Sequence, residues 1–156
     1  MEQNQNKKAI IYCRVSTKEQ VEGTSLDAQD SICRKYAERS GFEILKLFRE
    51  EGESAKTADR TQLLKMMDFA LKNYKEINSL IIYKVDRLAR NAADYADIKR
   101  YFSKLNIRVY SATENIDNTP WGRFAETMLA GWSQFDNEVR AERSRNGMIG
   151  AIKEGR

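Results

Sequence analysis

The chain has 156 residues, of which 41% are hydrophobic, with one proline and eight glycines, which suits one folded domain and excludes a disordered or fibrous protein. Its 27 basic and 23 acidic residues give a net charge of +4, a mild tendency towards polyanionic partners. The chain contains no histidine, which excludes Ser-His-Asp and Cys-His catalysis and argues against a zinc site.

The sequence carries no targeting or membrane signal. No apolar run approaches the roughly 20 residues that span a bilayer, and the polar start, Met1 to Lys8, has no signal-peptide core. We therefore expect a cytoplasmic protein. Cys13 and Cys33 lack metal-ligand spacing, so both are predicted to be reduced packing residues. We expect no metal and no other cofactor.

Apolar runs and helical patterns alternate along the chain, and this alternation favours an α/β fold. In chain order we expect strands at 9–13, 42–48, 80–83 and 107–111, and helices at 26–40, 60–75 and 92–105. Thr24 or Ser25 is the expected cap of the first helix, and Gly41 ends it. The charged segment 49–59 is predicted to be a mobile loop. The expected buried stripe of helix 60–75 is Leu63, Leu64, Met67, Ala70 and Leu71.

A long helix is predicted after Pro120, which suits a first helical turn. If residues 121–155 form one helix, it is about 52 Å long. Its first half carries an apolar stripe at helical spacing, formed by Trp121, Phe124, Ala125, Met128, Trp132, Phe135 and Val139. The stripe is predicted either to be buried on the helix's own sheet or to form a subunit interface. The expected architecture is a mainly parallel sheet of four to five strands with helices on both faces, followed by this C-terminal helix.

The end of the chain is basic. Residues 139–156 contain five basic and two acidic residues, which is most of the net charge. This segment is either a solvated helix face or a surface that contacts the phosphate backbone of DNA. The candidate DNA-binding residues are Arg140, Arg143, Arg145 and Lys153.

The first candidate site is Tyr12-Cys13-Arg14-Val15-Ser16-Thr17, at the end of the first strand. Strand alternation points Tyr12, Arg14 and Ser16 the same way, at the strand end where open α/β sheets keep their sites. The alternative is helix capping, because Ser16-x-x-Glu19 and Thr17-x-x-Gln20 both fit a capping box.

A second cluster, Asp86, Arg87 and Arg90, follows the third strand. Arg87 and Arg90 are three residues apart and project together if they share a helical turn. If the two strands are parallel neighbours, three arginines converge on the Ser16 hydroxyl. Arginine binds phosphate bidentately and keeps its charge, so this pocket suits attack on a phosphodiester. Asp86 either orients an arginine or transfers a proton, or forms an ordinary ion pair with Arg90.

These motifs, together with Ser25-Leu26-Asp27-Ala28-Gln29 and Tyr83-Lys84-Val85-Asp86-Arg87-Leu88-Ala89-Arg90, resemble the catalytic domain of the resolvase/invertase family of serine recombinases. The motifs stand in family order with family-like spacing, and the resemblance covers residues 8–156. It implies a catalytic domain at 1–120, a dimerisation and DNA-contacting helix at 121–156, and a sequence-reading DNA-binding domain absent from this chain.

The resemblance also implies a mechanism. The serine attacks a DNA phosphate and forms a 5′-phosphoserine bond, and strands are exchanged without ATP by a tetramer on two double-stranded DNA sites, built from dimers. Residues at positions that match the family's site are Ser16, Arg14, Arg87, Arg90, Asp86, Gln29, Arg60 and Tyr12. The alternative is a dimerisation and DNA-tethering module without chemistry. A small-molecule serine hydrolase is disfavoured, because a general base and a nucleophile-elbow pattern are both missing.

Overall fold

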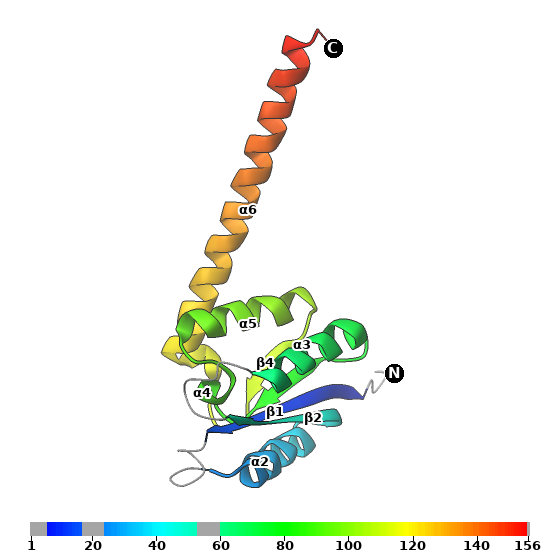
Figure 1. Ribbon diagram of the computed structural model, residues 1–156, viewed down its shortest axis with the longest axis vertical. Helices are drawn as coiled ribbons and strands as arrows, with labels where there is room; N and C mark the ends of the chain where they lie inside the picture. The colour runs from blue at the N-terminus through cyan, green and yellow to red at the C-terminus, as the bar shows by residue number, and fades with distance from the viewer. Residues whose placement is uncertain (1–5, 17–23, 53–59, 156) are drawn as a thin grey trace.

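The computed structural model describes residues 6–16, 24–52 and 60–155, which form a four-stranded sheet with helices on both faces and a projecting C-terminal helix (Figure 1). The strands are β1 (Lys7–Ser16), β2 (Phe42–Gly52), β3 (Ser79–Ile82) and β4 (Arg108–Ser111). Their order is β2-β1-β3-β4, and every neighbouring pair is parallel. The predicted fold class is therefore confirmed.

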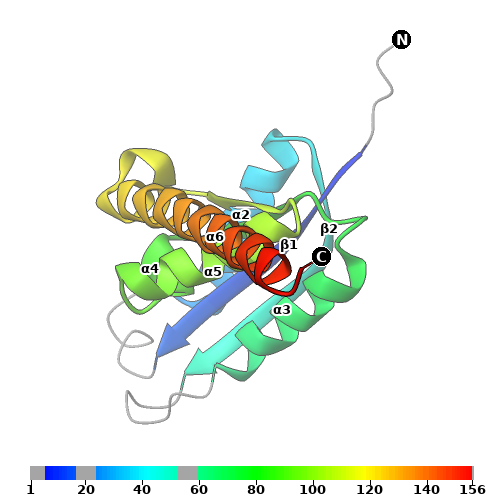
Figure 2. The same cartoon turned by 90° about the horizontal axis from the view of Figure 1, so that it is seen from above.

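Helices cover the two faces of the sheet unequally. The helical elements are α2 (Leu26–Arg39), α3 (Thr61–Asn73), the short α4 (Val85–Leu88), α5 (Ala92–Lys104), the 3-10 helix η1 (Ile116–Asn118) and α6 (Pro120–Lys153). Helix α2 lies on one face, whereas α3, α5 and the start of α6 lie on the other (Figures 1 and 2). Because side chains alternate along β1, this strand contributes to a hydrophobic core on each face of the sheet. Ile10 and Tyr12 belong to the core under α3, α5 and the start of α6, whereas Ile11 and Cys13 belong to the core under α2.

Helix ends follow the expected capping chemistry. Ser25, the N-cap of α2, accepts a hydrogen bond from the backbone N–H of Ala28 at 3.1 Å, and Gly41 follows the helix with a φ of 76°. Thr119 caps α6 by accepting from the N–H of Gly122, with Pro120 in the first turn. Of the two caps expected for α2, the structure uses Ser25.

The second strand is longer than predicted. β2 continues to Gly52 and pairs with β1 up to Ser16, so the assignment of 49–52 to a loop was wrong. Phe48 and Glu50 are both buried, so the period-2 pattern persists, but its last inward-facing side chain is a carboxylate. The rest of the expected loop, 53–59, lies outside the described residues, as do Glu19 and Gln20 of the expected capping boxes.

Helix α3 buries a different face from the one predicted. Met66 is fully buried with Leu63 and Ala70, whereas Leu64 is 65% exposed and Leu71 is 52% exposed. Helix α3 packs chiefly against β2, an edge strand, so only a narrow stripe of the helix reaches the core. The prediction that Leu64 and Leu71 are buried was wrong.

The two cysteines lie side by side in the core between β1 and α2. Cys13 and Cys33 are free thiols and are both buried. The hydrogen bond with Cys33, together with burial, raises the pKa of the Cys13 thiol. The Cys13 thiol therefore stays protonated, and both cysteines serve as packing, as predicted.

Helix α6 is 34 residues long, or about 51 Å, and only its beginning packs on the body (Figure 1). Ala125 is buried, and Trp121, Met128 and Trp132 pack against the core from its edge. Phe135 is 63% exposed, so the apolar stripe extends beyond the part of α6 that packs on the body. Across residues 6–16, 24–52 and 60–155, none of the helices combines the length and apolar character that crossing a bilayer requires.

Candidate active site

The two candidate clusters meet at one edge of the sheet. β1 and β3 are parallel neighbours, and β3 ends opposite Tyr12 while β1 continues to Ser16. After β3 the chain passes through two residues, Tyr83 and Lys84, and enters α4. The turn that carries Asp86 and Arg87 therefore lies beside the last residues of β1, at the carboxyl ends of the strands.

Arg14 joins β1 to this turn. Its Nε donates a hydrogen bond to the carbonyl oxygen of Arg87 at 3.1 Å, and its Nη2 donates to the carbonyl of Asp86 at 2.7 Å. The planar guanidinium has the fork geometry for two simultaneous acceptors. These contacts confirm the predicted neighbourhood of the two clusters and fix the guanidinium on the same face of β1 as Ser16.

Gln29 completes the hydrogen bonding of β1 on the side where β3 has ended. Its Oε1 accepts from the backbone N–H of Arg14 at 3.3 Å, and its Nε2 donates to the Arg14 carbonyl at 3.0 Å. Because β3 stops at Ile82, the fully buried amide of Gln29 takes the place of a neighbouring strand. Gln29 therefore supports the backbone of Arg14.

Tyr12 holds the start of α3 through a buried carboxylate. Its hydroxyl donates to Oε2 of Glu50 at 2.5 Å, and the same carboxylate accepts from the backbone N–H groups of Gln62 and Leu63 at 3.0 and 3.1 Å. Negative charge at a helix N-terminus is stabilising. Burial, together with the Glu50 carboxylate, raises the pKa of the Tyr12 phenol, so Tyr12 is a neutral donor.

Arg60 is held by an acid on α5. Its Nη1 and Nη2 donate to the two carboxylate oxygens of Asp94 at 2.6 and 3.0 Å. This hydrogen bond raises the pKa of Arg60. Oδ2 of Asp94 also accepts from the backbone N–H of Arg90 at 3.0 Å. One carboxylate therefore joins Arg60, the residue before α3, to Arg90, which lies two residues before α5.

Arg87 and Arg90 do not share a helical turn, which corrects the prediction. Helix α4 ends at Leu88, and Ala89 is extended, with φ −128° and ψ 153°. The carboxylate of Asp86 lies 3.7 Å from Nε of Arg87, and Glu114 accepts from the N–H of Val85 at 3.0 Å. Extended backbone at Ala89 turns the chain out of the helix, and the N–H of Arg90 then donates to Asp94.

Three acidic residues that organise this site were not predicted: Glu50, Asp94 and Glu114. Glu50 was assigned to a loop because the segment 49–59 is charged, contains a glycine and has almost no apolar residues. The sequence does contain a signal for Asp94, because the Asn-x-x-Asp spacing of Asn91 and Asp94 is typical of a helix start. In the structure Asn91 caps α5 by accepting from the N–H of Asp94. Glu114 has no local signal, since its partner is 29 residues away.

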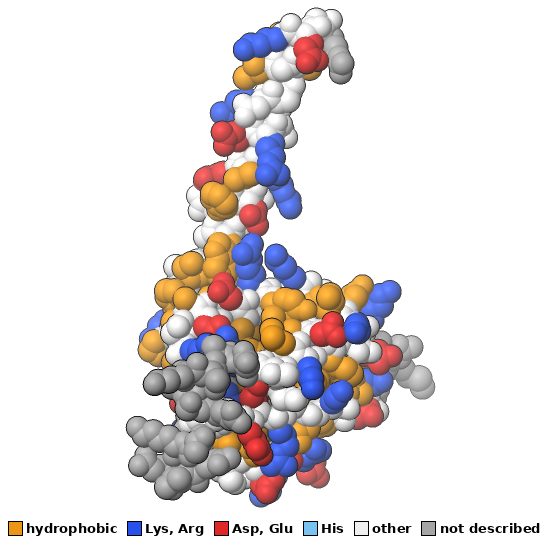
Figure 3. Space-filling view, viewed as in Figure 1, with side chains coloured by type: hydrophobic (Ala, Val, Ile, Leu, Met, Phe, Trp, Pro, Cys, Tyr) orange, Lys and Arg blue, Asp and Glu red, His pale blue; other side chains and the backbone are white. Residues whose placement is uncertain are grey.

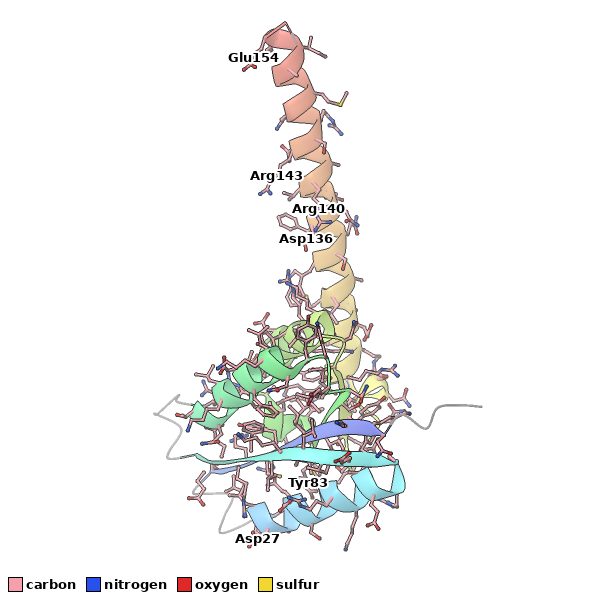
Figure 4. The ribbon with its side chains drawn as sticks, turned by 90° about the vertical axis from the view of Figure 1, so that its right-hand side faces the viewer. Asp27, Tyr83, Asp136, Arg140, Arg143 and Glu154 are labelled. Atoms are coloured by element: carbon pink, nitrogen blue, oxygen red, sulfur yellow. The ribbon has the colours of Figure 1, made fainter. Side chains whose placement is uncertain are left out.

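The basic residues of the C-terminal segment lie apart from this site. Arg140, Arg143, Arg145 and Lys153 are all exposed. Figure 4 shows Arg140 and Arg143 on the part of α6 that projects beyond the body, and Figure 3 shows basic side chains along this part of the helix. Within the part of the chain that the structure describes, no group of three or more histidine, cysteine or acidic side chains forms a metal site.

Comparisons with known proteins agree with this geometry. A family model described as the resolvase N-terminal domain matches residues 9–156. The chain is 30% identical over 146 residues to the transposon Tn917 resolvase of Enterococcus faecalis, covering 93% of this chain and 71% of that protein. It is 31% identical over 148 residues to a DNA-invertase of Escherichia phage P1, covering 94% and 72%. The crystal structure of the N-terminal catalytic domain of TP901-1 integrase superposes with a TM-score of 0.64 at 31% identity, covering 86% of this chain and 99% of that one.

Proposed function

Because the chain belongs to the resolvase family of serine recombinases, we propose that it recombines DNA at specific sites with Ser16 as the nucleophile. The observation that carries this proposal is the pair of hydrogen bonds from Arg14 to the carbonyls of Asp86 and Arg87. They bring the strand end that presents Ser16 against the turn that supplies further arginines. The family acts on DNA, and its relatives include resolvases and invertases.

In the proposed reaction, Oγ of Ser16 attacks the scissile phosphorus and the bond from phosphorus to the 3′ oxygen breaks. The products are a 5′-phosphoserine linkage and a free 3′-hydroxyl, which takes up a proton as the serine loses one. Arg14, Arg87 and Arg90 stabilise the charge on the phosphoryl oxygens, usually the largest contribution in such catalysis. Attack by a new 3′-hydroxyl reverses the step, so the phosphodiester energy is conserved without ATP.

The other predicted residues act as supports. Gln29 fixes the backbone of Arg14, and Tyr12 fixes α3 through Glu50. Arg60 lies between α3 and α5 and adds a further positive charge. Asp86 presents its carbonyl to Arg14 and its carboxylate to Arg87, which favours orientation of the arginines over proton transfer.

We further propose that residues 1–120 form the catalytic domain and that 121–156 form the helix that dimerises subunits and lies along DNA. The support is the uncovered stripe beyond Trp132, where Phe135 is 63% exposed, followed by the exposed basic residues of α6. Two such dimers form the tetramer that exchanges strands. Sedimentation of this chain tests the interface, and a strict monomer at high concentration contradicts it. Phe135→Glu is expected to weaken the dimer.

A covalent trap tests the nucleophile. The full-length gene product is incubated with labelled DNA fragments from the sequence that borders its own gene and quenched in denaturant. A protein–DNA adduct is expected for the wild type and is expected to vanish in Ser16→Ala. An adduct that persists in Ser16→Ala contradicts the nucleophile, and no wild-type adduct with any bordering fragment favours the DNA-tethering alternative.

A further inference from the structure

A single carboxylate connects two of the arginines that surround the proposed site. Asp94 accepts two hydrogen bonds from the guanidinium of Arg60, at 2.6 and 3.0 Å, and one from the backbone N–H of Arg90, at 3.0 Å. Arg60 precedes α3 and Arg90 precedes α5, so these contacts link two segments that are otherwise placed by different helices. From this arrangement we propose that Asp94 is a positioning residue that orients Arg60, and with it Arg90, towards the scissile phosphate.

The ion pair differs from an ordinary surface salt bridge, which contributes little. It is bidentate, and the side chains of Arg60 and Asp94 are only 22% and 20% exposed. It borders a cleft of about 350 Å³ with an apolar wall. The cleft is lined by Leu63, Leu64, Met67, Ile98 and Tyr101, together with Arg60, Asp94 and Asp97. Partial shielding from water and fork geometry both strengthen the pair.

The backbone of Asp94 is itself fixed. It occupies the first turn of α5, where the side chain of Asn91 accepts a hydrogen bond from its N–H at 2.9 Å. Burial acts to raise the pKa of the Asp94 carboxyl, but the hydrogen bonds from Arg60 and from the N–H of Arg90 prevail and lower it. Asp94 is therefore a charged acceptor on a rigid element, which is what holding a guanidinium in one orientation requires.

The backbone N–H of Arg90 donates to the same acid, just after α4 has ended. The residue before it, Ala89, is extended, and α4 stops at Leu88. Its backbone is thus positioned by the start of α5, and Asp94 supplies that contact. The Arg60 end is similarly supported, because Glu50 caps α3 through Gln62 and Leu63. A loss of Asp94 should loosen both arginines without removing either.

The proposal rests on the proposed function, and a double-mutant cycle tests it. In the adduct assay at saturating DNA, Asp94→Asn is expected to slow adduct formation by about tenfold to 100-fold, the range for a group displaced by about 1 Å. In an Arg60→Ala background the same substitution should change the rate by less than about threefold, because the Arg60 guanidinium is gone and the asparagine Oδ1 can still accept from the N–H of Arg90. The control is Asp97→Asn, an exposed acid one turn later on α5, which should leave the rate unchanged.

The outcomes separate this proposal from the assignment of Ser16. If the wild type forms the adduct, Ser16→Ala does not, and Asp94→Asn matches the wild type, the positioning role is overturned while the nucleophile stands. Equal slowing by Asp94→Asn in both backgrounds also overturns it, because a general structural defect does not depend on Arg60. If Asp94→Asn fails to fold, the cycle is run with Asp94→Glu, which keeps the charge but lengthens the side chain, and the same two comparisons decide.

Discussion

Arg14 reaches two carbonyl oxygens of the α4 turn at once, through Nε and Nη2. Lysine has a single ammonium on a flexible stem and cannot reproduce this fork. We expect Arg14→Lys to destabilise the fold by only about 1 to 2 kcal/mol, because hydrogen bonds from a charged group contribute about 1.5–3 kcal/mol and the ammonium and water replace part of them. We expect it to slow adduct formation by about 100-fold or more, because the guanidinium no longer has a fixed place beside the phosphate.

The measurements for Arg14→Lys are urea unfolding and the rate of the covalent adduct with DNA, on the same preparation. A variant that unfolds at much lower urea would give Arg14 a mainly structural role. A variant with the wild-type rate would remove Arg14 from the set of phosphate-binding arginines.

The raised pKa of the Tyr12 phenol predicts how the stability of the fold changes at alkaline pH. In the unfolded chain a tyrosine ionises near pH 10, whereas burial, together with the Glu50 carboxylate, raises the pKa of Tyr12 in the folded protein. Above about pH 10 the unfolded state therefore releases a proton that the native state keeps, so stability falls as pH rises, by up to about 1.4 kcal/mol per pH unit from this group. The contribution is present in full below pH 10.

Tyr12→Phe removes this pH dependence together with the hydrogen bond to Glu50. At neutral pH the variant should be less stable by about 2 kcal/mol, typical for a buried hydrogen bond to a carboxylate. The deficit should shrink between about pH 10 and 12, as the wild type loses the contribution of its phenol. Chemical unfolding at several pH values measures both, and parallel stability curves for the two proteins would contradict the raised pKa.

At the scale of elements, the start of α6 depends on a glycine. A Cβ on Gly122 would lie 2.1 Å from the carbonyl oxygen of Ile116, and that oxygen also accepts from the Thr119 hydroxyl. Gly122→Ala must therefore push η1 away from α6. We expect a loss of about 3 kcal/mol or more, as for other overpacked sites.

Gly131, in the same helix, is the matched control. Its Cβ would meet no atom within 4 Å, so alanine there only improves helix propensity, by up to about 1 kcal/mol. Thermal unfolding of the two variants should shift in opposite directions. A Gly122→Ala protein as stable as the wild type would mean that the contact between η1 and α6 is looser than it is in this structure.

The elements themselves were predictable, because strands and helices leave periodic patterns in the sequence. The positions of the four strands along the chain, a cap at Thr24 or Ser25 and the long helix after Pro120 all followed from local rules. The end of β2 did not, since the inward position after Phe48 is a carboxylate, Glu50, whose donors come from α3 and Tyr12. The spacing of apolar residues cannot reveal a buried polar residue whose hydrogen-bond partners lie far away in the sequence.

The neighbourhood of the two clusters was predicted, whereas three acidic residues that hold them, Glu50, Asp94 and Glu114, were missed. The strand rule placed Tyr12, Arg14 and Ser16 on one face, and the parallel pairing of β1 with β3 brought the second cluster beside them. The wrong expectation, one helical turn for Arg87 and Arg90, assumed that α4 continues past Leu88. Extended backbone at Ala89 ends that helix, and the N–H of Arg90 then donates to Asp94 on the next helix, a tertiary contact that spacing alone does not encode.

At the scale of the whole molecule, the proposed chemistry and the proposed DNA contacts occupy opposite ends. The body carries the proposed chemistry, while the outer part of α6 carries exposed basic residues on a projecting helix (Figure 1). Binding through such residues releases counterions from DNA, so affinity should fall steeply with salt. Since Arg143 and Arg145 lie far along α6, they should contribute to affinity and not to the covalent step.

Nonspecific duplex DNA tests this division. For the double variant Arg143→Gln and Arg145→Gln, the slope of log affinity against log salt should become shallower by about 0.9 for each phosphate that the protein no longer neutralises. The covalent rate at saturating DNA should stay within about twofold of the wild type, because the arginines at the scissile phosphate are untouched. Lys35→Gln, an exposed residue of α2 on the opposite face of the sheet, is the control and should leave the slope unchanged. If Lys35→Gln makes the slope shallower by the same amount per charge removed, affinity depends on net charge alone. That result would contradict the proposal that α6 lies along the DNA.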